Sequence, residues 1–142
     1  MNSPDPGRWA PELRSVLRIV AAFLFIAHGA QKLFVWPVLQ PRDPAALGSL
    51  TGIAGIIELV GGALMLVGLF SRPVAFILAG QMAVAYFKAH APQNFWPILN
   101  RGELAVLYCF VWLYFSAAGP GPWSIDAMIR RPKKLKIPVP AR

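Results

Sequence analysis

The sequence is short of charged residues. They make up 14% of its 142 positions, whereas a soluble domain usually carries about 25%. Hydrophobic residues make up 56%, and the mean hydropathy is +0.52. These values exclude an ordinary soluble domain and, at this length, predict a single membrane-embedded unit.

Cysteine is also scarce, because Cys109 in an apolar run is the sole example. One thiol cannot form a disulfide within the chain or a paired-cysteine metal or redox motif, so we expect Cys109 to serve packing and predict no metal site. The apolar stretch 13–36 is long for a signal sequence, and no small-residue cleavage site follows it. We therefore expect no cleavable signal peptide.

Acidic residues are fewer than basic ones, six against fourteen, which gives a formal net charge of +8. Nucleic acid is one partner that such a charge suggests. However, six of the basic residues lie in the last thirteen positions, namely Arg130, Arg131, Lys133, Lys134, Lys136 and Arg142. A basic tail after a membrane helix is typical of contact with anionic lipid headgroups, so we predict the lipid bilayer as partner and no nucleic acid.

Four apolar stretches approach the length of about 20 residues that a bilayer crossing requires. They cover about 13–36, 50–70, 73–90 and 101–118, and the last two are short. Prolines and glycines separate them, and the tight connection at 71–72 makes the second and third antiparallel neighbours. The sequence predicts an all-α polytopic membrane protein, an antiparallel bundle of four transmembrane helices between an N-terminal segment 1–12 and a tail 119–142.

The basic residues favour one orientation. Ten of them lie on the side of the two termini and four on the opposite side. Because cytoplasmic segments carry the excess of Lys and Arg, both termini are predicted to be cytoplasmic. Four tryptophans lie near predicted span ends or in the tail, as interfacial aromatic belts do: Trp36, Trp96, Trp112 and Trp123.

A carboxylate interrupts the second predicted span. Glu58 is the lone charged residue of 50–70, and an acidic residue at the centre of a membrane helix costs roughly 2.5 to 3.5 kcal/mol. A partner or a function must offset that cost. Gly55, Gly61 and Gly62 flank Glu58 at helical spacing, and small residues on this face let a neighbouring helix approach closely.

The other polar residues of the spans fall at a similar depth. A helix rise of about 1.5 Å per residue places this candidate polar site in the outer half of the bilayer: His28, Gln31, Lys32, Glu58, Gln81, Lys88, His90 and Glu103. Charged groups in lipid face the bundle interior and pair with one another. We predict His28 or Lys32 as the partner of Glu58, and Lys88 or His90 as the partner of Glu103.

These residues also have structural explanations. The side chains of Lys32 and Lys88 can extend to the outer headgroups. Glu103 can interact with a helix dipole, with Asn100 as the N-cap, and His90 can lie at the interface. A polar clamp that holds the helices together therefore remains as compatible with the cluster as a functional site.

The segment after the fourth span has local signals of its own. Ser124 is placed to cap a short helix that continues to Arg130, and Pro132 is placed to end it. Trp123 can then lie at the inner interface, and the basic residues that follow can hold this segment against anionic lipid.

Several of these segments together resemble the DoxX family of small four-helix membrane proteins. They are Arg18 with His28-Gly29-Ala30-Gln31-Lys32-Leu33, Glu58-Leu59-Val60-Gly61-Gly62-Ala63-Leu64 with Leu66-Val67-Gly68-Leu69, Gly102-Glu103-Leu104-Ala105, and Gly119-Pro120-Gly121-Pro122-Trp123-Ser124-Ile125-Asp126. The resemblance covers about 18–126 and implies a multi-pass protein of a bacterial or archaeal cytoplasmic membrane. The family's motif positions match His28, Gln31, Lys32, Glu58, Glu103, Trp123, Ser124 and Asp126.

The resemblance implies an association with redox or oxidative-stress complexes, since the family takes its name from a thiosulfate:quinone oxidoreductase. One hypothesis is a quinone headgroup in the outer-half site, where a histidine donates to a quinone oxygen and a carboxylate relays protons. The sequence has no haem-ligand pair and no flavin or dinucleotide motif, so electrons would come through a partner subunit or a soluble donor. The other hypothesis is a non-enzymatic scaffold, assembly or transporter-like subunit, which self-association would also suit.

Overall fold

The computed structural model describes residues 6–37 and 43–130, which are helical with no strand among them. The helices are α1 (Ala10–Phe34, after a 3-10 turn at Pro6–Trp9), α2 (Leu50–Val67), α3 (Ser71–Ala85, continued by a π-helical turn at Tyr86–His90), α4 (Pro97–Asn100), α5 (Glu103–Ala118) and α6 (Ile125–Arg130). The predicted all-α class is confirmed.

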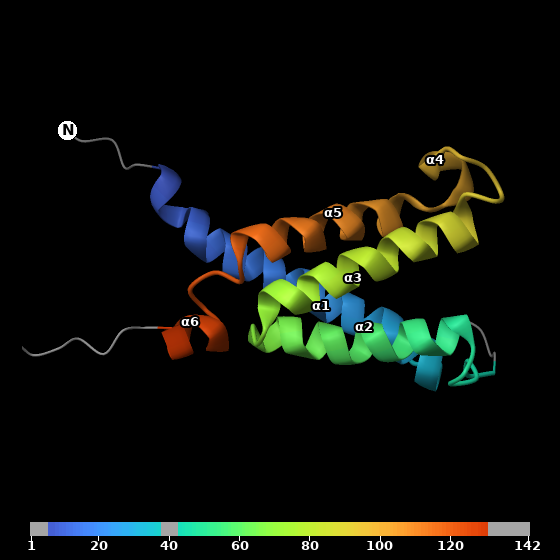
Figure 1. Cartoon of the computed structure of the whole chain (residues 1–142), viewed down its shortest axis with the longest axis horizontal. Helices are drawn as coiled ribbons and strands as arrows, with labels where there is room; N and C mark the ends of the chain where they lie inside the picture. Colours follow the sequence, from blue (N-terminus) through green and yellow to red (C-terminus); the bar gives the residue numbers. More distant parts are fainter. Residues whose placement is uncertain (1–5, 38–42, 131–142) are drawn as a thin grey trace, which may run out of the picture.

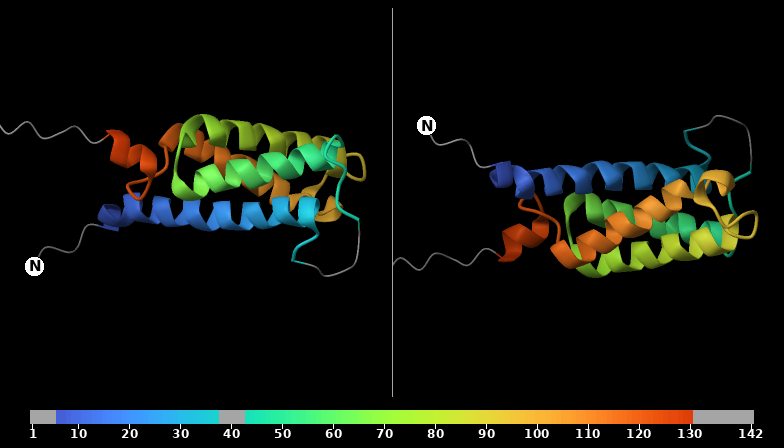
Figure 2. Two further views of the ribbon diagram at one scale, coloured as in Figure 1. Left: turned by 90° about the horizontal axis from the view of Figure 1, so that it is seen from below. Right: turned by 90° about the horizontal axis from the view of Figure 1, so that it is seen from above.

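The long helices pack in pairs. Helix α1 packs along α2 and α3 packs along α5, while α2 also contacts α3 (Figure 1). The beginning of α1 and helix α6 lie at the same end of the molecule, which we call the terminal end (Figure 2). The end of α1, the beginning of α2 and the short helix α4 lie at the opposite end, which we call the loop end.

Glycine makes the contact between α1 and α2 close. A Cβ atom on Gly29 would lie 2.7 Å from the backbone nitrogen of Leu59, and one on Gly62 would lie 2.8 Å from Cγ1 of Ile26. Real Cβ atoms do not approach so closely, so the two backbones meet where both helices lack side chains. This contact fixes which face of α2 points toward α3 and therefore where Glu58 lies.

Helix α2 ends three residues earlier than the predicted limit at residue 70. Gly68 has φ 71° and ends the helix in the left-handed conformation, which glycine adopts without a steric penalty. Helix α3 then begins at Ser71. At its other end α2 is capped by Ser49, whose Oγ accepts a hydrogen bond of 3.0 Å from the amide of Gly52.

One tryptophan does not lie where the aromatic-belt prediction placed it. Trp112 is fully buried in the core, with its ring 5.3 Å from that of Phe25 and 6.1 Å from that of Phe115. Trp112 shares one helix face with Tyr108 and Phe115, four residues before it and three after, and that face packs inward. Trp36, Trp96 and Trp123 are each more than half exposed, and the prediction was wrong for Trp112.

The outer surface is apolar. Large side chains such as Phe23, Phe76 and Phe110 are each at least 64% exposed, and such an extensive apolar exterior is typical of a lipid-facing surface. Within the described residues, two helical stretches are long and apolar enough to cross a membrane, Gly7–Phe34 and Leu50–Val67. Helix α5 is apolar but shorter.

Candidate functional site

A pocket of about 720 Å³ lies toward the loop end, where the two helix pairs face each other. Its walls come from α1, α2, α3 and α5 and are mostly apolar, with Phe25, Ile57 and Met82 among them. Its polar and charged lining residues are His28, Lys32, Thr51, Glu58, Gln81, Lys88, His90, Arg101 and Tyr108. Six of the eight predicted site residues therefore line one cavity.

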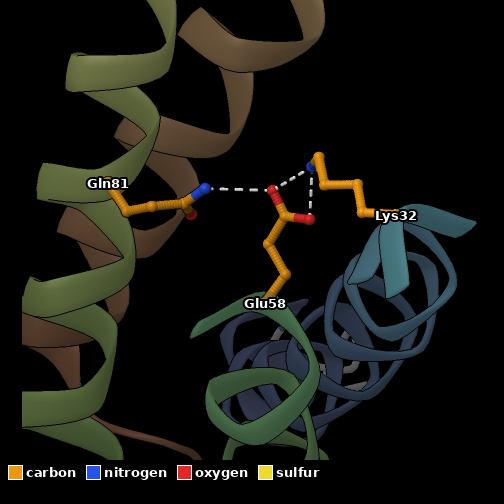
Figure 3. A network of polar contacts seen from close by, with 3 residues as sticks. All are labelled: Lys32, Glu58 and Gln81. Carbon is orange, nitrogen blue, oxygen red and sulfur yellow. Dashed lines mark hydrogen bonds and ion pairs between the residues drawn. The ribbon is translucent and has the colours of Figure 1, made fainter. Parts of the chain in front are cut away.

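Glu58 is the centre of the polar network in this pocket (Figure 3). Its side chain is 1% exposed, and both carboxylate oxygens accept hydrogen bonds from Nζ of Lys32. Oε1 also accepts a bond of 3.0 Å from Nε2 of Gln81. Of the two partners predicted for Glu58, Lys32 makes the ion pair, and a residue of α3 completes the network.

One atom of the Gln81 side-chain amide lacks a hydrogen-bond partner among the described residues. Its nitrogen donates to Glu58, which fixes the orientation of the amide, and its Oε1 is buried without a hydrogen-bond partner among the described residues. A buried acceptor left unpaired costs about 1–3 kcal/mol. A ligand that donates an N–H or O–H group would satisfy it.

His28 lies beside this network without a hydrogen bond to Glu58. Its ring is 6.2 Å from that of Tyr108 and meets it edge to face. The prediction of His28 as a partner of Glu58 is therefore wrong for this structure. Lys32 is one helical turn farther along the same face of α1, and its longer side chain reaches across to α2.

The rim of the pocket is basic. Lys88 and His90 lie in the π-helical turn after α3, and Arg101 lies just before α5. Nδ1 of His90 lies 3.0 Å from the carbonyl oxygen of Asn100, so this nitrogen carries the proton. Asn100 is 3% exposed and also donates a bond of 2.6 Å to the carbonyl of Asn94, which secures the connection between α3 and α5.

Two predicted site residues lie apart from the pocket. Gln31 is half-buried at the loop end, and its Nε2 donates to the carbonyl of Pro37. Glu103 is exposed and makes no ion pair within the described residues. Its predicted pairing with Lys88 or His90 was wrong because Lys88 is exposed and His90 bonds to backbone. Asn100 is not the N-cap of α5, because Gly102 occupies the N-cap position. The side-chain oxygen of Asn100 instead accepts a hydrogen bond from the amide of Gly102.

The Trp123–Asp126 motif forms a second polar cluster at the terminal end. Ser124 accepts a bond of 3.2 Å from the amide of Ala127, which confirms it as the cap of α6. The carboxylate of Asp126 accepts bonds of 2.9 and 2.8 Å from the amides of Phe70 and Ser71. It therefore joins α6 to the first turn of α3.

Asp126 titrates below its usual range. Burial by itself raises the pKa of this carboxyl. The hydrogen bonds from Ser71 and Phe70 and the charge of Arg130 outweigh burial and lower the pKa below 3.8. Asp126 is therefore charged in any physiological environment.

Arg18 is the main polar residue of the terminal end, whereas the sequence placed it only among the basic residues of that side and in the stretch that resembles the DoxX family. It is fully buried. Its guanidinium donates to the carbonyls of Pro120 at 2.9 Å and Leu66 at 2.6 Å, and also to those of Met65 and Trp123. The sequence could have predicted this role, because Arg18 lies inside the predicted first span. A charged residue within a membrane span needs polar partners, as Glu58 does.

Other predictions fall partly or wholly beyond the described residues. Pro132 as the end of α6 and the basic residues Arg131, Lys133, Lys134, Lys136 and Arg142 lie outside them. Arg42 does as well. Within the described residues, no group of three His, Cys, Asp or Glu side chains is arranged to hold a metal ion.

Comparison with known proteins identifies a family and two relatives of this chain. The sequence profile of the DoxX family matches residues 13–91, more than half of the chain. An uncharacterized protein of Haemophilus influenzae is 42% identical over 123 residues, covering 84% of this chain and 92% of that protein. An uncharacterized membrane protein of Mycobacterium tuberculosis is 26% identical over 132 residues, covering 81% and 80% of the two chains. No solved structure matches. The chain is a membrane protein that belongs to the DoxX family.

Proposed function

We propose that the chain crosses the cytoplasmic membrane as an antiparallel bundle of α1, α2, α3 and α5, and that its loop-end pocket binds the headgroup of a quinone. It would serve as a redox-associated membrane subunit. The observation that carries the proposal is the pocket itself, because an apolar cavity ends on a buried carboxylate network with an unpaired acceptor at Gln81.

The size and lining of the pocket suit such a ligand. Ligand pockets commonly measure about 300–1,000 Å³, with apolar walls and a few polar groups that set orientation, and this one measures about 720 Å³. A bound quinone supplies chemistry in which two electrons and two protons are exchanged. The hydroxyl of its reduced form is the kind of donor that Oε1 of Gln81 lacks.

The residues of the pocket divide this work between binding and proton handling. Lys32 forms an ion pair with the carboxylate of Glu58, and Gln81 donates a hydrogen bond to the same carboxylate. His28 lines the same pocket, and its imidazole can donate a proton to a ligand oxygen or accept one from it. The ring of Tyr108 meets that of His28 edge to face at the same pocket.

The test is quinone binding to the purified protein. Gln81→Leu removes the unpaired acceptor and leaves the ion pair between Lys32 and Glu58 in place. We expect this variant to bind a short-chain quinol at least about tenfold more weakly, as the loss of a hydrogen bond in a closed site predicts. Gln93→Leu is the matched control, because Gln93 is exposed and is not itself a lining residue of the pocket. Equal affinity in wild type and both variants would contradict the proposal.

A second candidate function has an observation in its favour. The carboxylate of Glu58 is almost fully buried and joins α1, α2 and α3 through Lys32 and Gln81. Such a network can lock three helices together in a scaffold or assembly subunit without binding any ligand. The two functions predict different results when both charges of the ion pair are removed together.

The orientation in the membrane can be tested separately. We propose that the terminal end faces the cytoplasm, because Arg14, Arg72 and Arg130 line one pocket there and Arg8 lies in the turn before α1. Ile98 at the loop end and Met128 at the terminal end are 71% and 68% exposed. In intact cells, a membrane-impermeant thiol reagent should label Ile98→Cys but label Met128→Cys only after lysis. The reverse pattern would contradict the orientation.

A further inference from the structure

A second pocket, of about 330 Å³, lies at the terminal end, away from the proposed quinone site. It is formed by the loop 119–122 with residues from the beginnings of α1 and α3 and from α6. Three arginines line it, Arg14 of α1, Arg72 of α3 and Arg130 of α6. They come from three separate helices that the fold brings to one place.

Two of these arginines are anchored in the same way. Nη1 of Arg14 donates to the carbonyl of Ala118 at 2.9 Å, and Nη1 of Arg72 donates to the carbonyl of Ala117 at 2.6 Å. Both bonds satisfy carbonyls at the end of α5, which is the negative end of the helix dipole. Each guanidinium carries five N–H donors, so this anchoring occupies only part of it and fixes the direction of the rest.

One donor of the pocket lacks a partner. Nε of Arg14 is buried and has no hydrogen-bond acceptor among the described residues. A buried donor of a charged group left unpaired is costly. An anionic oxygen in the pocket would satisfy it.

The charge of the pocket is positive. Asp126 is its single acidic lining residue, and the amides of Phe70 and Ser71 already bind that carboxylate. Three guanidinium groups therefore face one carboxylate that is engaged elsewhere. Clustered arginines with free N–H groups suit the oxygens of a phosphate group.

We propose that this terminal-end pocket binds the phosphate of an anionic phospholipid. Two exposed tryptophans support a lipid as the source of the phosphate: Trp9 is 54% exposed before α1, and Trp123 is 55% exposed before α6. Tryptophan side chains favour the level of the lipid headgroups. The pocket thus lies where a membrane would present its phosphates, and bound lipid would join α1, α3 and α6.

The experiment uses the full-length protein reconstituted in phosphatidylcholine vesicles that contain a small fraction of phosphatidylglycerol. Quenching of tryptophan fluorescence by either lipid, brominated on its chains, gives the preference for phosphatidylglycerol over phosphatidylcholine. We expect the wild type to prefer phosphatidylglycerol, and we expect Arg14→Gln with Arg72→Gln to lose most of that preference. A basic residue near an anionic surface contributes about fivefold. Arg130→Gln should lower the preference by a similar factor, and because Arg130 is exposed at the end of α6 this variant preserves the fold.

Two variants with the same loss of charge are the controls. Lys88→Gln with Arg101→Gln removes two charges at the loop end, and Lys133→Gln with Lys134→Gln removes two from the tail. Both should retain more of the preference than the pocket variant. If either control loses as much, the preference reflects overall charge and the proposal is wrong. If inorganic phosphate at matched ionic strength abolishes the preference, the pocket takes a soluble phosphate and the lipid assignment is overturned.

Discussion

The substitution Glu58→Gln tests whether the buried network stabilises the fold, and its effect can be worked out from the structure. Glutamine keeps the shape of the side chain and can still meet Gln81, but it removes the charge that Lys32 binds. Hydrogen bonds to charged groups are worth about 1.5–3 kcal/mol, and breaking a buried ion pair costs about 3–5 kcal/mol.

The side chain of Lys32 is 27% exposed, so its ammonium can turn toward the open part of the pocket once the carboxylate is lost. The lower end of these ranges therefore applies, and we expect a loss of about 2–3 kcal/mol. For a chain of this size that corresponds to a fall in Tm of roughly 5–10 °C. Thermal unfolding in a neutral detergent, followed by circular dichroism, measures it. Asp43→Asn is the matched control, because Asp43 is exposed before α2.

The double variant Glu58→Gln with Lys32→Met separates the two candidate functions. Removing both charges leaves no orphaned ion, and replacing a buried pair by apolar groups is often neutral. We expect the double variant to be more stable than Glu58→Gln alone. If the pocket binds quinol, we expect both Glu58→Gln and the double variant to lose quinol binding, although the double variant regains stability. If the network is only a structural clamp, we expect the double variant to match the wild type in every measured property. Additive losses in a double-mutant cycle would refute the ion pair itself.

Three further predictions concern other parts of the fold. Arg18→Gln leaves several backbone carbonyls unpaired, so we expect a loss of about 3–5 kcal/mol and faster trypsin cleavage near Arg130, whereas Arg8→Gln at an exposed position should change neither. Folding lowers the pKa of Asp126 below its ordinary value of 3.8, so the carboxylate stabilises the fold fully above pH 3.8 and loses this effect as the pH falls through the folded-state pKa. The Tm of the wild type should therefore drop in that acidic range. The Tm of Asp126→Asn should be lower than that of the wild type at neutral pH and should change less in the acidic range. Gly29→Ala should cost about 1–3 kcal/mol because its Cβ would lie 2.7 Å from Leu59, while Gly80→Ala, with open space around it, should be neutral or stabilise by up to about 1 kcal/mol.

Much of the fold follows from simple features of the sequence. Apolar length and proline breaks located the long helices, and the glycines beside Glu58 indicated the close contact between α1 and α2. The ends of the helices were harder to predict, because a left-handed Gly68 and a π-helical turn after Ala85 depend on local geometry. Helix α4 is four residues long, and its sequence lacks any periodic signal.

The sequence predicted the depth of the candidate site along the helices but only some of the contacts between its side chains. Helix rise placed His28, Glu58 and Gln81 at nearly one level, with Lys32 one turn above His28, and the structure joins Glu58 to Lys32 and Gln81. The same argument favoured His28 over Lys32 as the level-matched neighbour of Glu58, because depth alone ignores how far a side chain reaches. It also included Glu103, whose position at the beginning of α5 is level with the pocket yet exposed. The rotation of a helix about its axis decides whether a residue at this level faces the pocket or the exterior, and helix packing sets that rotation.

Arg18 and Glu58 are the most deeply buried charged residues of the described part of the chain, and they have opposite surroundings. Arg18 is fully buried, and its guanidinium donates to four backbone carbonyls, so it closes the terminal end as a structural element. Glu58 is equally buried, yet its partner Lys32 is partly exposed and its neighbour Gln81 keeps an unpaired oxygen beside a large cavity. A purely structural network gains nothing from an unpaired acceptor, since each such group costs free energy. The incomplete network at the loop end is therefore where a ligand would add stability.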